Sequence, residues 1–542
     1  MTTPRNITPD GSDPRQAPER LPEWARKVGQ ENVALRKGTL RKGVVFNAMG
    51  AAAQIVSSII GTILLARLLD PTDFAAYGII SPIVVTLLIF GDGGTSYITL
   101  RSRSLEHEPL SELFSATLIA SLIVMPLALA GIGAALWAAG RTDALTPGLL
   151  MAVSILTTGL TVQHSAIATR SFRNDLRVLV TIVSSLGALG LSIMLALAGG
   201  GLYALVGLFF FRSLITMLMF HVLVGWRPDL RRVGTDTVAD LRRLGFFDLT
   251  SRGIKSVSAE SDKFLAGLLL APTAAGLYVL AHMLIVTGAR QLLQPIQQML
   301  VPYFTEVRRT DHYGGHVLGT FRLFTVIMAP GSLWLALAAD DLMFLVMGRQ
   351  EADLVTAVCV LCLGLSIEIM SRCSGAAFAA ADMPKKTVQV QTVVLLVKVG
   401  IIAAVALSTA ALGQDLTVAR FVSAAGGAMV FAGLFRLSMV ARTFGLPFPL
   451  VFQRMALPYG AAALAMAGVV LAAQAILPDA GLWGAIGRVA LGVLGVGAVT
   501  MTSVLVFVRD HPIVNDLLAP LTGKPRKRRG RRAAALASGD EV

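Results

Sequence analysis

The chain has 542 residues, of which 54% are hydrophobic and only 15% charged, and its mean hydropathy is +0.69. Soluble globular proteins carry about 25% charged residues, so this composition excludes a soluble protein and predicts many membrane spans. The net charge of +14 would suit a nucleic-acid-binding protein, but the basic residues cluster between apolar runs, so we expect no nucleic-acid partner.

Apolar runs of span length recur along nearly the whole chain. A helix needs about 20 apolar residues to cross the bilayer, and lipid-embedded backbone must bond within its own segment, which favours helices. The expected fold class is therefore an all-α polytopic membrane protein with about 14 transmembrane helices. The segment 342–347 is too short to cross and should lie at the interface. The expected spans start near Val44, Ala75, Phe114, Thr146, Val178, Leu202, Phe247, Leu277, Leu318, Asp353, Val388, Leu416, Leu457 and Leu482.

Two short features are interpreted without a special chemistry. Residues 1–43 are polar and Pro-rich, with no short apolar segment close to Met1, so we expect no cleaved signal peptide. Cys359, Cys362 and Cys373 fall in one predicted span. No His or second CxxC accompanies them, so we interpret them as small buried residues and expect no metal and no cofactor.

Basic residues fill every second connection between the predicted spans. Lys385 and Lys386 lie in one such connection, whereas the connection 199–201 is Gly-Gly-Gly. Positively charged connections stay in the cytoplasm, so both termini are predicted to be cytoplasmic and the number of spans to be even. We expect the basic tail "KPRKRRGRR" (524–532) to contact anionic lipid head groups.

One segment that joins two predicted helices occurs twice in the sequence. The stretch "LLARLLDPTDFAAYGII" (64–80) returns in altered form as "AGLLLAPTAAGLYVL" (266–280), each with a Tyr six residues after the Pro. The offset from Pro71 to Pro272, 272 − 71 = 201 positions, matches about six helices with short loops and predicts two parallel six-helix halves. The expected domains are the cytoplasmic polar segment 1–43, the N-terminal bundle 44–224, the basic cytoplasmic linker 225–246, the C-terminal bundle 247–438, two additional helices 457–508 and the basic cytoplasmic tail 509–542.

Each half opens with a helix that carries a polar stripe. Gln54 in the first stripe corresponds to Lys255 in the second at the same offset, and the polar residues of each helix lie within an arc of about 100°. A charge at the centre of a membrane helix costs about 2.5–3.5 kcal/mol, so the second stripe must face water or partner groups. A purely structural alternative is that charges such as Glu260 and Lys263 pair locally at i,i+3.

We interpret the stripes as the lining of a water-filled cavity between the halves. Lys and Arg attract phosphate and Gln bonds to hydroxyl groups, so the cavity suits an anionic, hydroxyl-rich cargo. Glu260 and Asp262 are candidates for carrying a coupling proton or cation. The candidate substrate-binding residues are Lys255, Lys263, Arg290, Gln294, Gln298 and Gln54.

The two joints, together with the pair Asp262-Lys263 ahead of the second joint, resemble the polysaccharide-transport (O-antigen flippase-like) family. That family belongs to the multidrug/oligosaccharidyl-lipid/polysaccharide exporter superfamily. The resemblance covers about residues 40–439, although Asp70, Ala75 and Ala271 stand where the family usually has Gly. It implies a V-shaped pair of bundles, alternating access, and export of lipid-linked (polyprenyl-pyrophosphate) oligosaccharide units across the bacterial inner membrane. Inner-membrane lipids and polysaccharide polymerase or export machinery are the implied partners.

Alternatives stay open at this point. An ion-coupled multidrug antiporter of the same superfamily would favour an acid-lined cavity, and a lipid II flippase would share the basic one. A membrane polysaccharide polymerase needs an extramembrane site with paired carboxylates or a metal, and the connections here are short. No Walker A motif occurs in the sequence, so we expect that the chain does not itself hydrolyse ATP. With short connections that carry no catalytic cluster, we expect a transporter rather than an enzyme.

Overall fold

A computed structural model describes most of the chain. Its described residues form helices and connecting turns without a strand, which confirms the expected all-α fold. The polar segment 1–36 and the basic tail 509–542 lie outside the described residues, so the expectations for them stay predictions. The described residues are 37–101, 105–171, 173–242, 246–308, 313–348, 350–478 and 481–508.

The first half of the chain forms seven helices and two short elements. The helices are α2 (Lys37–Leu68), α3 (Pro71–Gly91), α4 (Thr95–Arg101), α5 (His107–Ala138), α6 (Leu145–Arg170), α7 (Asn174–Leu197) and α8 (Leu202–Val224). The short elements are η1 (Thr142–Ala144) and α9 (Thr235–Asp240).

The second half repeats this pattern and adds two helices. Its elements are α10 (Phe246–Leu269), α11 (Pro272–His282), η3 (Met283–Thr287), α12 (Gly288–Val307), α13 (Tyr313–Leu337), α14 (Ala339–Met347), α15 (Ala352–Ser371), α16 (Ser374–Ala380), α17 (Pro384–Ala411) and α18 (Val418–Thr443). The additional helices are α19 (Phe448–Ile476) and α20 (Leu482–Phe507).

Twelve helical segments within the described residues are long and apolar enough to cross a membrane. Helices α2 and α10, the first of each half, are long but not among them, because α10 carries the charged stripe and only Ala52–Leu68 of α2 is apolar. The twelve segments together with α2 and α10 equal in number the fourteen spans expected from the sequence. Helix α14 has nine residues, too few to cross, as expected for 342–347.

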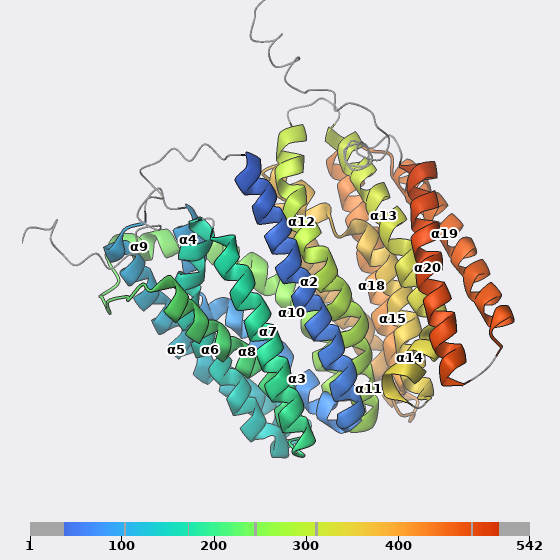
Figure 1. Ribbon diagram of the computed structural model, residues 1–542, viewed down its shortest axis with the longest axis horizontal. Helices are drawn as coiled ribbons and strands as arrows, with labels where there is room; N and C mark the ends of the chain where they lie inside the picture. Colours follow the sequence, from blue (N-terminus) through green and yellow to red (C-terminus); the bar gives the residue numbers. More distant parts are fainter. Residues whose placement is uncertain are drawn as a thin grey trace, which may run out of the picture.

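The two halves lie side by side (Figure 1). Helix α2 packs against α7 of its own half and also contacts α12 of the other, while α19 and α20 cover α13. Both Pro-Thr joints lie at one end, here called the joint end. The other end, which carries Arg170, Arg227 and Lys385, is called the basic end.

The Pro-Thr joints begin helices in the same way in both halves. Pro71 and Pro272 occupy the first turns of α3 and α11, and the residues before them are extended, with ψ of 147° at both Asp70 and Ala271. Proline suits this position because its missing N–H would have had no helical partner, and it keeps the preceding residue out of the helical region. Each joint therefore ends one span and starts the next.

Glycines bring the halves into backbone contact at the joint end. A Cβ on Gly276 would lie 1.7 Å from the carbonyl oxygen of Pro71, and a Cβ on Gly78 would lie 2.5 Å from Val279. Helix α3 therefore packs closely on both α10 and α11, as small residues allow in membrane helices. The two halves are closed against each other at this end.

Polar contacts join α3 to α10 nearer the basic end. The hydroxyl groups of Thr86 and Ser256 lie 3.2 Å apart, and Arg252 forms an ion pair of 2.7 Å with Asp92. Asp92 also accepts hydrogen bonds from the backbone N–H and the hydroxyl of Ser96 in the first turn of α4. One side of the interface between the halves is thus held along its length.

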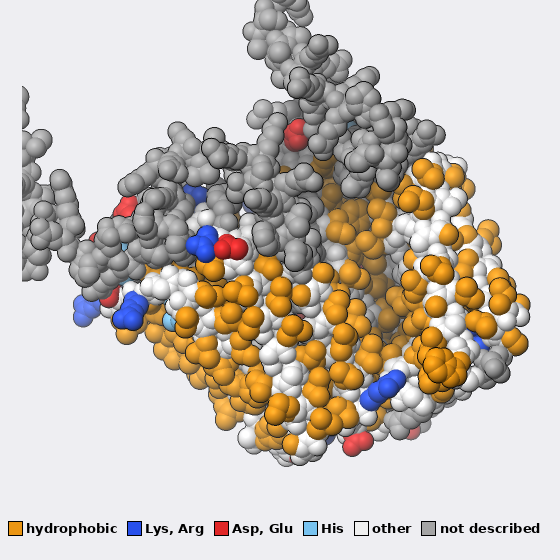
Figure 2. Space-filling view, viewed as in Figure 1, with side chains coloured by type: hydrophobic (Ala, Val, Ile, Leu, Met, Phe, Trp, Pro, Cys, Tyr) orange, Lys and Arg blue, Asp and Glu red, His pale blue; other side chains and the backbone are white. Residues whose placement is uncertain are grey.

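The helices expose many large hydrophobic side chains, as a membrane protein requires. Figure 2 shows hydrophobic side chains over most of the viewed face and a hollow between the side formed by α2 and α12 and the side formed by α20. A separate cavity of about 310 Å³ lies between α3, α10 and α17, and residues such as Ile83, Phe264 and Leu395 line it.

Candidate functional site

The stripe on α10 brings two carboxylates into the protein interior. Glu260 forms an ion pair of 2.7 Å with Arg290 of α12, and Lys263, one turn further along α10, pairs with its other oxygen. Arg290 also donates a 2.7 Å hydrogen bond to the carbonyl oxygen of Ala259. Glu260 and Lys263 are buried, while Arg290 is partly exposed.

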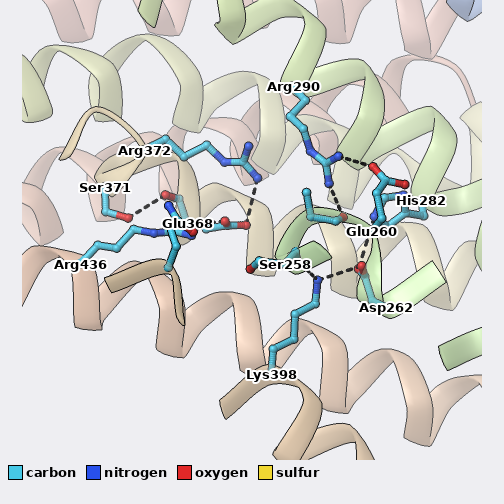
Figure 3. Close-up of polar contacts among 12 residues, drawn as sticks. Ser258, Glu260, Asp262, His282, Arg290, Glu368, Ser371, Arg372, Lys398 and Arg436 are labelled. Atoms are coloured by element: carbon cyan, nitrogen blue, oxygen red, sulfur yellow. Dashed lines mark hydrogen bonds and ion pairs between the residues drawn. The ribbon is translucent and has the colours of Figure 1, made fainter. Parts of the chain in front are cut away.

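Asp262 is completely buried and has partners from two other helices. Lys398 of α17 places its Nζ 2.8 Å from Oδ1 of Asp262 and donates a 3.0 Å hydrogen bond to the carbonyl oxygen of Ser258. The Tyr278 hydroxyl donates a 3.1 Å hydrogen bond to Oδ2 of Asp262, and Nε2 of His282 lies 3.3 Å from the same oxygen. Figure 3 shows Lys398 and His282 approaching Asp262 from different helices.

A second buried carboxylate lies on α15. Glu368 forms ion pairs of 2.8 Å with Arg436 of α18 and 3.2 Å with Arg372. Arg436 also donates a 3.3 Å hydrogen bond to Gln391 of α17. Each of the carboxylates Glu260, Asp262 and Glu368 thus faces two basic side chains.

Lys255 is the exception among the basic side chains of this region. It is exposed, and no carboxylate within the described residues pairs with it. It lies close enough to Arg290, Arg372 and Arg436 for mutual electrostatic repulsion. Counting these groups, six cations (Lys255, Lys263, Arg290, Arg372, Lys398 and Arg436) face three carboxylates, which leaves an excess of three positive charges.

A π-helical turn separates α11, which carries Tyr278 and His282, from α12, which carries Arg290. The π-helical turn η3 joins these two helices into one span. A π-turn inserts an extra residue into the helical period and often marks a functional site. It changes the faces on which the residues after it, Arg290 among them, are presented relative to Tyr278 and His282.

The structure places the predicted site residues in different environments. Lys255 and Gln294 are exposed, and Gln54 and Arg290 are partly exposed. Lys263, Glu260 and Asp262 are buried in ion pairs, so part of the local pairing considered from the sequence is present. The side chain of Gln298 lies outside the described part of the structure.

Sequence reasoning missed Arg436 as a member of this region. The sequence could have identified it, because Arg436 lies within an apolar run, and an ionisable residue there usually faces the interior of a bundle. In the described residues, no group of three or more His, Cys, Asp and Glu side chains could hold a metal ion. Cys362 and Cys373 are buried as free thiols and Cys359 is partly exposed.

The arrangement of the helices is similar to that of two membrane proteins of known structure. The lipid II flippase MurJ in an inward closed conformation superposes with a TM-score of 0.65 and 13% identity, over 85% of this chain and 99% of that one. An inward-facing multidrug resistance MATE family transporter of the MOP superfamily gives a TM-score of 0.57 and 16% identity, over 72% of this chain and 94% of that one. At such identities the likeness shows the fold.

The sequence identifies the family within that fold. The family described as "Polysaccharide biosynthesis protein" matches residues 64–356, more than half of the chain, and the chain belongs to it. The succinoglycan biosynthesis transport protein ExoT of Rhizobium meliloti (strain 1021) is 25% identical over 293 residues. That match covers 53% of this chain and 58% of ExoT, so it spans less than two thirds of the relative. The resemblance seen in the two joints is confirmed.

Proposed function

We propose that this protein translocates polyprenyl-pyrophosphate-linked oligosaccharide units across the bacterial inner membrane by alternating access. The observation that carries the proposal is the excess of three positive charges among the six basic and three acidic side chains described above, in which Lys255 is the exposed member. Each uncompensated charge at membrane depth costs about 2.5–3.5 kcal/mol. An anionic group that enters between the halves would offset that cost.

The charged head of such a cargo matches the available donors. Lys255 and Arg372 lie near Arg290, and guanidinium groups bind phosphate oxygens through two donors at once. Gln54, Gln294 and Gln298 are the proposed contacts for sugar hydroxyls. Lys263 acts indirectly. It pairs with Glu260, the same carboxylate that Arg290 contacts, so the charge of Arg290 is only partly compensated.

The apolar part of the cargo also has a place to lie. Hydrophobic side chains line the hollow in Figure 2, and the face around it is mainly hydrophobic. A polyprenyl chain can remain there in contact with lipid while the head group crosses between the halves. The basic end would face the cytoplasm, with both termini on that side, as the positive-inside pattern predicts.

Two of the rival functions fit the charges less well. A carrier of cationic drugs would present carboxylates to its cargo, whereas Glu260, Asp262 and Glu368 each already face two basic groups. An enzyme would need reactive groups in an accessible cleft, and the relative ExoT is named as a transport protein. A lipid II flippase would use the same head-group chemistry, and the test below separates the two by cargo.

Substitution of the least paired cation tests the proposal. Lys255→Gln removes one exposed charge without orphaning a carboxylate, and we expect lipid-linked repeat units to accumulate on the inner leaflet while surface polysaccharide falls several-fold. Lys385→Gln, an exposed lysine at the basic end, is the matched control. Normal export by both variants at equal protein levels would contradict the proposal. Accumulation of lipid II instead would indicate the other flippase.

A further inference from the structure

The buried carboxylate of Asp262 already holds a cation, and the chain itself supplies it. The Lys398 ammonium lies 2.8 Å from Oδ1 of Asp262 and 3.0 Å from the carbonyl oxygen of Ser258. We infer that this position is a site for a monovalent cation that Lys398 fills permanently. The consequence is that the protein takes up no sodium or potassium ion at Asp262.

The surroundings of Asp262 are those of a cation site. Oδ1 of the Asp262 carboxylate and the backbone carbonyl of Ser258 converge on the Lys398 ammonium, and oxygen ligands of these kinds suit hard cations. The Tyr278 hydroxyl donates to the other oxygen of Asp262 and holds the carboxylate in place. The site is almost closed to solvent, since Asp262 and His282 have no exposed side-chain surface and Lys398 has 10%. The two oxygen ligands come from α10, and the Lys398 side chain reaches them from α17.

The other charged and titratable groups that face the site favour a fixed cation over a mobile one. Glu260 is paired with Lys263 and Arg290. Tyr278 and His282 of α11 contact Oδ2 of Asp262. A free ion entering here would have to displace an ammonium that is covalently attached and so cannot diffuse away. Because the attached ammonium is held at high local concentration, competition by sodium at ordinary concentrations is weak.

This inference rests on the proposed function only in its consequence for transport. If the protein exports an anionic cargo, its export should proceed equally well with choline in place of sodium. Asp262 then acts as an anchor between α10 and α17 and not as the carrier of a coupling metal ion. The cation site itself can be tested without any cargo.

The experiment measures sodium binding by purified protein in lipid nanodiscs. Thermal unfolding and equilibrium binding of radioactive sodium are compared in NaCl and in choline chloride at equal ionic strength. We expect the wild type to show the same Tm in both salts and no bound sodium. Lys398→Ala should have a lower Tm in choline, a sodium-dependent rise in Tm and about one bound sodium per chain. The double variant Lys398→Ala/Asp262→Asn should lose the sodium effect.

Two results would overturn the inference. One is sodium binding by the wild type that disappears in Asp262→Asn, because it would show that Lys398 does not fill the site. The other is a folded Lys398→Ala protein that does not respond to sodium. If Lys398→Ala does not accumulate, Lys398→Met keeps the apolar stem and takes its place, and the wild-type measurement still decides. Absence of cargo transport would count against the proposed function and leave these results unchanged.

Discussion

Alanine at Gly276 should separate the two halves at the joint end. Its Cβ would lie 1.7 Å from the carbonyl oxygen and 2.4 Å from the carbonyl carbon of Pro71, whereas real Cβ atoms essentially never approach closer than 3.0 Å. The backbones of α3 and α11 must therefore move apart by about 1.3 Å (3.0 − 1.7). No side-chain rotation can relieve a clash with a backbone carbonyl.

The size of the effect follows from the cost of overpacking. An extra methyl group in a close-packed contact costs about 1–3 kcal/mol. If this cost falls only on the state in which the joints touch, the equilibrium shifts toward an open joint end by roughly 5- to 150-fold. The proposed transport cycle would then be biased toward its outward-facing state.

Distances between spin labels at the joint end measure this shift. Asp143 and Gln414 are exposed at that end, one in each half, and each can be replaced by a labelled cysteine in a background without Cys359. We expect a longer distance population in Gly276→Ala. Gly427→Ala is the control, since nothing lies within 4 Å of its added Cβ. An unchanged distance distribution in Gly276→Ala would refute the contact between the joints.

Two further predictions concern ion pairs. Glu260→Gln leaves Lys263 and Arg290 without their carboxylate, and we expect it to lower the free energy of unfolding by about 3–5 kcal/mol; an unchanged Tm would show that these cations find other counter-charges. Arg488→Ala removes the two-point pair of 2.8 and 2.5 Å that joins α20 to Asp341 of α14, at a cost of about 1.5–3 kcal/mol. Asp341→Ala should cost a similar amount, and the double variant much less than their sum; full additivity would argue against the pair.

Much of the architecture could be predicted from residue order alone. Apolar runs of span length, together with Pro71 and Pro272 at helix starts, predict the number of helices and the duplication, because both depend on local backbone preference and on hydropathy. The polar stripe of α10 was also predictable from the helical period. The close pair of Glu260 and Lys263 followed from the same period, since residues three apart share a helix face.

The partners of the remaining charges were decided by tertiary packing. Lys398 meets Asp262, and Arg436 meets Glu368, across helices that lie far apart in the sequence. The helical period tells which face of a helix is polar, but it carries no information about which other helix covers that face. Whether a cation binds cargo or holds a buried carboxylate depends on that neighbour, because electrostatic interactions weaken with distance and strengthen away from water. For this reason Lys255 and Lys263, which look alike in the sequence, differ in the folded protein: one is exposed and the other is sealed in an ion pair.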